Sequence, residues 1–129
     1  MEEIKETGYV YNGKVELDTS SIFSRLILEA GRWCESYASD IIENIDDIKS
    51  VLSKVPSEWS KNKKRFAIMD GNSAKVEWRF GFRRKGVDYA GWIDDNLKND
   101  CRKYYYRSIW KLVLEATDDK VTATLTRQQ

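Results

Sequence analysis

The sequence predicts an α+β fold in which a long amphipathic helix packs on one face of a mainly antiparallel sheet. Between Ser20 and Val55, apolar residues recur every three or four positions, which is the period of a helix. From residue 65 onward, apolar and polar residues alternate, which is typical of strands with one buried face. Because helix and strands occupy separate parts of the chain, we expect a single α+β domain over residues 1–129.

An N-terminal β-hairpin is predicted over residues 7–18. Two short apolar runs, Tyr9–Tyr11 and Val15–Leu17, flank the dipeptide Asn12–Gly13. Asparagine and glycine both accept the positive φ angles that a type I′ turn requires. We therefore expect two antiparallel strands joined by a two-residue turn.

The long helix is expected to begin after the N-cap residues Asp18–Ser20 and to end before Pro56. At about 1.5 Å per residue, an unbroken helix would be about 50 Å long. That length is large for a domain of this size. We therefore expect a bend or a break near Ser39–Asp40 or between Asn44 and Asp47.

Four strands are expected after the helix. The clearest covers residues 74–84, where Val76, Trp78 and Phe80 alternate with charged residues. The others cover residues 65–69, 104–116 and 121–126, and a short helical insert is expected within residues 89–100. The helix should cover the apolar face of these strands and leave the other face carrying basic side chains.

Charge is divided unevenly along the chain, although the formal net charge is only +1. Residues 1–60 contain 6 Lys or Arg against 12 Asp or Glu, and residues 61–129 contain 16 against 9. Such asymmetry is typical of a binding surface, and it also arises when two halves of one fold neutralise each other. An acidic and a basic surface on one molecule would also allow head-to-tail association, so a homo-oligomer is an alternative to a monomer.

The favoured interpretation is a non-enzymatic interaction protein that regulates or inhibits a protein that handles nucleic acid. The polar side of the predicted helix would dock on a basic groove of that partner, because charge complementarity selects partners and raises association rates. The acidic side chains of this surface are Glu29, Glu35, Asp40, Glu43, Asp46 and Asp47. A small chain without recognisable motifs is typical of accessory proteins of phages and mobile elements, and no motif assigns it to a family.

The first alternative is direct binding of single-stranded nucleic acid to a basic sheet face. Phosphates would contact Lys and Arg, and bases would stack on exposed rings. The candidate residues are Lys75, Arg79, Arg83, Arg84, Tyr105, Arg107 and Lys111.

The second alternative, an enzyme, would have to work without histidine, which the chain lacks. This absence removes the usual catalytic triads and most transition-metal sites, so we expect no cofactor and no metal. Catalysis would then rely on carboxylates such as Asp94 and Asp95, or on Cys101 as a nucleophile. The sequence has no secretory or membrane-spanning segment, so we expect a cytoplasmic protein without a membrane partner.

Overall fold

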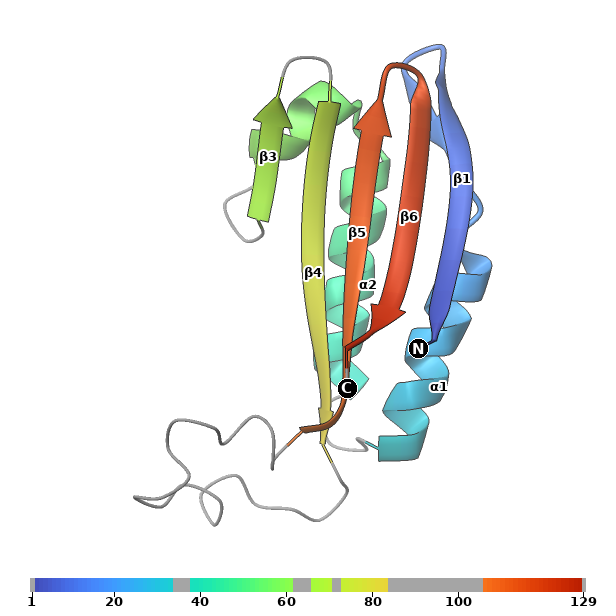
Figure 1. Ribbon diagram of the computed structural model, residues 1–129, viewed down its shortest axis with the longest axis vertical. Coiled ribbons are helices and arrows are strands. Elements are labelled where there is room, and N and C mark those ends of the chain that lie inside the picture. Colours follow the sequence, from blue (N-terminus) through green and yellow to red (C-terminus); the bar gives the residue numbers. More distant parts are fainter. Residues whose placement is uncertain (1, 34–37, 62–65, 71–72, 84–105, 129) are drawn as a thin grey trace.

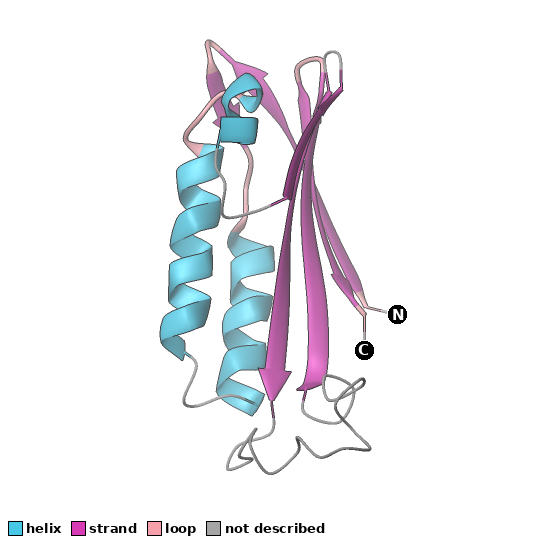
Figure 2. Cartoon of the chain, turned by 90° about the vertical axis from the view of Figure 1, so that its left-hand side faces the viewer, coloured by secondary structure: helices cyan, strands magenta, loops and turns pink. Residues whose placement is uncertain are grey.

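A computed structural model describes residues 2–33, 38–61, 66–70, 73–83 and 106–128. These residues form two layers, a six-stranded sheet and two helices on one of its faces (Figures 1 and 2). The strands are β1 (Glu3–Tyr11), β2 (Lys14–Glu16), β3 (Phe66–Asp70), β4 (Ser73–Arg83), β5 (Tyr106–Thr117) and β6 (Lys120–Arg127). The helices are α1 (Ser20–Trp33), α2 (Ala38–Leu52) and the short 3₁₀ helix η2 (Pro56–Lys61). The predicted α+β class is confirmed, and the predicted helical insert within residues 89–100 lies outside the described residues.

The sheet is antiparallel throughout, with the strand order β2-β1-β6-β5-β4-β3. The last strand therefore lies next to the first long strand, and their register runs from Glu3↔Thr126 to Tyr9↔Lys120. Strand β1 begins at Glu3, four residues before the predicted hairpin, because this pairing extends it. We call the sheet face that is turned away from the helices the outer face; no described element covers it (Figure 2).

The long helix is not confirmed as one element; the segment forms two shorter helices, in keeping with the expected bend or break. Helix α1 has 14 residues and α2 has 15, and they run side by side in opposite directions on the same face of the sheet (Figure 2). A single helix of about 50 Å would extend beyond the longest strands, which are about 40 Å long. Folding the helical segment back lets both apolar stripes cover the sheet. Helix α1 ends at Trp33 and α2 begins at Ala38, close to the predicted break at Ser39–Asp40.

The core lies between the helices and the sheet. On β4, the alternating residues Val76, Trp78 and Phe80 are buried, as their period-two spacing predicts. The helices contribute apolar side chains at helical spacing, among them Ile22, Leu26, Ile45, Ile48 and Val51. Helix η2 adds Trp59, whose indole N–H donates to the carbonyl of Lys54 at 3.2 Å.

Two local predictions at the N-terminal end of the fold are confirmed. Asn12 and Gly13 have φ angles of 50° and 73°, which close the β1–β2 hairpin as a type I′ turn requires. At the start of α1, Asp18 Oδ1 accepts hydrogen bonds from Ser20 N at 3.0 Å and from Ser20 Oγ at 2.6 Å. These hydrogen bonds hold the pKa of Asp18 below its ordinary value, because they favour the charged carboxylate.

Candidate functional site

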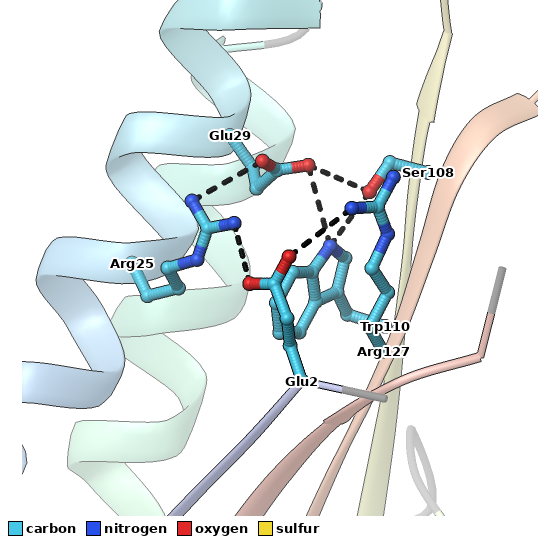
Figure 3. Close-up of polar contacts among 6 residues, drawn as sticks. All are labelled: Glu2, Arg25, Glu29, Ser108, Trp110 and Arg127. Carbon is cyan, nitrogen blue, oxygen red and sulfur yellow. Dashed lines mark hydrogen bonds and ion pairs between the residues drawn. The ribbon is translucent and has the colours of Figure 1, made fainter.

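Glu29 lies in the interior between α1 and the sheet (Figure 3). Its Oε2 accepts hydrogen bonds from Ser108 Oγ at 2.6 Å and from Trp110 Nε1 at 3.3 Å. Its Oε1 lies 3.2 Å from Arg25 Nη1, one helical turn away. The prediction that Glu29 belongs to an exposed acidic surface is therefore wrong, because a buried carboxylate with these partners is held inside the fold.

Arg25 extends this network to Glu2, just before β1, and through Glu2 to Arg127 at the end of β6. Its Nη2 contacts Glu2 Oε2 at 2.8 Å, and Glu2 Oε1 lies 3.2 Å from Arg127 Nη1 (Figure 3). The hydrogen bond from Arg25 is the main reason why the pKa of Glu2 lies below its ordinary value of 4.5; loss of hydration opposes the shift, and attraction to both arginines adds to it. The Arg25 guanidinium also lies over the Trp110 ring, 5.0 Å from its centroid. This network joins α1 to β5, to the end of β6 and to the residue that precedes β1, so it holds the helix against the sheet.

The other predicted acids do not form one described surface. On α2, Asp46 is exposed, whereas Asp47 is half-buried and its Oδ2 accepts a hydrogen bond from Trp78 Nε1 at 2.9 Å. Asp40 and Glu43 also belong to α2, but their side chains lie outside the described part of the structure. Glu35 lies outside the described residues altogether.

The solvent-facing side of α1 carries apolar, hydroxyl and basic side chains and no acidic one. Ile27 and Leu28 are 58% and 63% exposed, and the neighbouring Ser24 and Gly31 are exposed as well. The exposed side of this helix therefore offers no carboxylate to a basic groove.

Three of the predicted basic residues share the outer face of the sheet. Lys75 and Arg79 lie on β4, and Lys111 of β5 is the direct cross-strand neighbour of Arg79. Glu77 lies between them, 3.4 Å from Arg79 Nε and 3.7 Å from Lys111 Nζ, so part of this positive charge is neutralised. Arg83 and Arg107 belong to β4 and β5 with side chains outside the described part, and Arg84 and Tyr105 lie outside the described residues.

A hollow of about 310 Å³ opens on the outer face over β1, β5 and β6. At its centre, Thr122 and Thr124 of β6 lie opposite Glu115 and Val113 of β5. The remaining lining residues are Lys5, Thr117 and Lys120. The lining combines the short side chains of threonine and valine with the longer ones of lysine and glutamate.

Two exposed tyrosines lie on the same outer face, on β1. Tyr9 is 61% exposed and pairs in register with Lys120 at the margin of the hollow, and Tyr11 is 66% exposed. The sequence contained a signal for this surface, since Thr122, Thr124 and Thr126 alternate with apolar residues. It contained no signal that β6 lies beside β1, and this pairing is what brings the threonines, Lys5 and Tyr9 together.

The hollow brings charged groups of both signs together with hydroxyl groups. Lys5 and Lys120 can bind anionic groups, Glu115 can bind a cationic group, and threonine hydroxyls can donate or accept hydrogen bonds. Among the described residues, no group of three His, Cys, Asp or Glu side chains is placed to hold a metal ion. The residues that the sequence suggested for catalysis lie outside the described residues; they are Asp94, Asp95 and Cys101.

No family model, curated protein or solved structure matches this chain. No helix within the described ranges is long and apolar enough to cross a membrane.

Proposed function

We propose that the protein acts by binding, without catalysis, and that the outer face of the sheet is the surface on which it holds another protein. The observation that carries this proposal is the hollow over β1, β5 and β6, which no described element covers, with exposed Tyr9 at its margin. Open sheet faces in small domains are usually polar all over, whereas this one combines a depression, a large exposed ring and hydrogen-bonding side chains.

The mixed charge of this face supports a protein partner. Glu77 and Glu115 alternate with Lys75 and Lys111 across β4 and β5. A polyanion would be repelled by the carboxylates, whereas a protein surface can place both signs of charge opposite their counterparts. Tyrosine is also enriched at protein–protein interfaces, because its ring provides contact area and its hydroxyl provides a hydrogen bond.

The proposal made from the sequence, an acidic helix that docks on a protein that handles nucleic acid, has less support. It now rests on Asp46 and on the positions of Asp40 and Glu43 along α2. We therefore propose the outer face as the contact surface. A partner that handles nucleic acid stays a prediction.

The test is capture of a partner from the native host with matched surface variants. Thr124→Arg would fill the hollow, and Asp46→Lys would reverse the exposed charge on α2. We expect a protein that co-purifies with the parent chain to be lost with Thr124→Arg and retained with Asp46→Lys, while circular dichroism shows that both variants fold. Loss with Asp46→Lys alone would assign binding to the helices, and capture of no protein by the parent would refute protein binding.

A second candidate, binding of single-stranded nucleic acid, is favoured by one specific observation. Lys5 and Lys120 have no ion pair within the described part of the chain, and Tyr9 lies beside Lys120 on the same face. Phosphates could contact the lysines while a base stacks on the ring. Fluorescence anisotropy with short single strands should then show affinity that falls steeply with salt. Tyr9→Ala should weaken binding by about tenfold, and no binding at low salt would exclude this candidate.

A further inference from the structure

Strand β1 has an open edge. Strand β2 pairs with β1 only from Tyr9 to Tyr11, and after β2 the chain passes close to Gly8. From Glu3 to Thr7, β1 is therefore paired on its β6 side alone within the described part of the structure. Three of these five side chains, those of Glu3, Lys5 and Thr7, are exposed.

The main-chain groups along this edge can be assigned from the hydrogen bonds at both ends of the strand. Val10 N donates to Asp119 O at 2.7 Å, and Glu2 O accepts from Arg127 N at 3.0 Å. Even-numbered residues of β1 therefore direct their N–H and C=O groups toward β6, because these groups alternate along an antiparallel strand. It follows that Glu3, Lys5 and Thr7 direct theirs away from β6, to the open edge. An edge of this kind is a template for a further strand.

We propose that a second copy of this chain occupies the edge, with the two β1 strands antiparallel about a two-fold axis at Ile4. In that register, Glu3 of each copy lies opposite Lys5 of the other on the outer face, so two opposite-charge cross-strand pairs form. A two-fold axis at Lys5 would place two lysines opposite each other, and one at Glu6 would place two glutamates opposite each other. Charge complementarity therefore selects the axis at Ile4.

The same register is also compatible with the side chains on the sheet face that is turned toward the helices. Ile4 packs against the core and would meet Ile4 of the second copy, which covers its exposed part. The next pair brings Glu2 toward Glu6 of the second copy. Glu2 is already bound by Arg25 and Arg127, and Glu6 accepts a hydrogen bond from Ser21 Oγ at 2.7 Å.

Such a dimer would join two sheets into one and bring two hollows onto a common outer surface. Lys5 lines the hollow and also lies on the open edge, so the hollows of the two copies would be neighbours across the axis. This inference goes beyond the proposed function and does not depend on it, since pairing requires only the edge.

The first test is a charge swap read by sedimentation velocity and by light scattering after size exclusion. We expect the parent chain to dimerise as its concentration rises. Glu3→Lys and Lys5→Glu should each weaken the dimer by about tenfold, because two attractive pairs become repulsive. The double variant, Glu3→Lys with Lys5→Glu, should restore dimerisation close to the parental level. A parent that stays monomeric up to millimolar concentration, or a double variant weaker than both single ones, would overturn the proposal.

The second test is a cross-link across the axis. In the proposed register, Ile4 of the two copies forms a non-hydrogen-bonded pair with Cα atoms about 4.5 Å apart, which is within the range of a disulfide. Ile4→Cys should therefore yield a covalent dimer under mild oxidation. The parent, which keeps its two native cysteines, and Glu6→Cys are the controls. Equal cross-linking of Glu6→Cys, or none with Ile4→Cys in a sample that dimerises, would assign the dimer to another surface and refute the edge pairing.

Discussion

Glu29 and Ser108 meet in the interior of the protein, where Ser108 Oγ donates a hydrogen bond of 2.6 Å to Glu29 Oε2. The two residues are 79 positions apart in the sequence, on α1 and β5. The contact fixes the position of α1 along β5, because hydrogen bonds to a buried carboxylate are strong and directional. Arg25 completes the surroundings of this carboxylate from the helix side.

Removal of the Glu29 carboxylate should destabilise the fold substantially. Glu29→Ala would leave Ser108 Oγ without its acceptor and Arg25 without one of its two carboxylate partners, whereas Trp110 Nε1 would keep Ser108 Oγ as an acceptor at 2.6 Å. Breaking a buried pair in this way costs about 3 kcal/mol in the free energy of unfolding. Glu29→Gln should cost less, since its side-chain oxygen can still accept from Ser108. Urea denaturation monitored by circular dichroism measures both variants, and an unchanged midpoint for Glu29→Ala would contradict the network.

The stability of the fold should decrease in acid through Glu2. Its pKa is lower in the folded protein than its ordinary value of 4.5, mainly because Arg25 donates a hydrogen bond to the charged form. The unfolded chain therefore takes up protons first as the pH falls, so the stabilisation is complete above the unfolded pKa and is lost as the pH falls through the folded pKa. Asp18 should act in the same direction, starting from its ordinary value of 3.8.

Glu2→Gln isolates this effect. The variant should be less stable than the parent at neutral pH, and the difference should shrink as the pH falls below about 4.5. Thermal melts of both proteins across that range provide the measurement. A difference that stays constant down to strongly acidic pH would mean that Glu2 does not contribute through its charge.

Neighbouring acids on α2 should respond differently to substitution. The Asp47 carboxylate accepts the indole N–H of Trp78, whose side chain is buried, whereas Asp46 is exposed. Asp47→Ala should lower the free energy of unfolding by about 1–2 kcal/mol, because the indole N–H loses an acceptor. Asp46→Ala, the matched control, should change it by less than about 0.5 kcal/mol. Equal effects of the two substitutions would show that the contact with Trp78 contributes nothing measurable.

The local elements could be predicted from the sequence because their signals are local. The alternation of Val76, Trp78 and Phe80 identifies β4 and its buried face, since side chains of a strand point to opposite faces in turn. The same period places Lys75 and Arg79 together on the outer face. The Asn12–Gly13 turn is likewise determined by the two residues that adopt it.

The long-range relationships could not be predicted from periodicity. The pairing of Glu3 with Thr126 joins residues near opposite ends of the described chain, and it creates both the hollow and the open edge of β1. The division of the helix depends on the length of the sheet that it covers. The burial of Glu29 did have a signal, because Ser108 occupies a core position on β5, and a polar residue there requires a partner.

Two glycines, one in β1 and one in α1, should respond to alanine in opposite directions. A Cβ atom at Gly8 would collide with the carbonyl oxygen of Glu16 and lie 2.9 Å from Leu17 Cα, where the chain crosses β1. Both neighbours are main-chain atoms, so the strand must move, and Gly8→Ala should cost about 2 kcal/mol in the free energy of unfolding. Gly31 lies in α1, and among the described residues no atom beyond its chain neighbours and its own helix backbone lies within 4 Å of such a Cβ.

Gly31→Ala should therefore stabilise the protein by about 0.5–1 kcal/mol, because alanine loses less backbone entropy in a helix than glycine does. Guanidinium unfolding of the two variants beside the parent measures both changes. Because the two substitutions add the same methyl group, the difference between them reports the surroundings of each glycine and not the chemistry of the change. A Gly8→Ala variant as stable as the parent would mean that the chain after β2 does not pass against β1 at this point, and the open edge of β1 would then extend beyond Thr7.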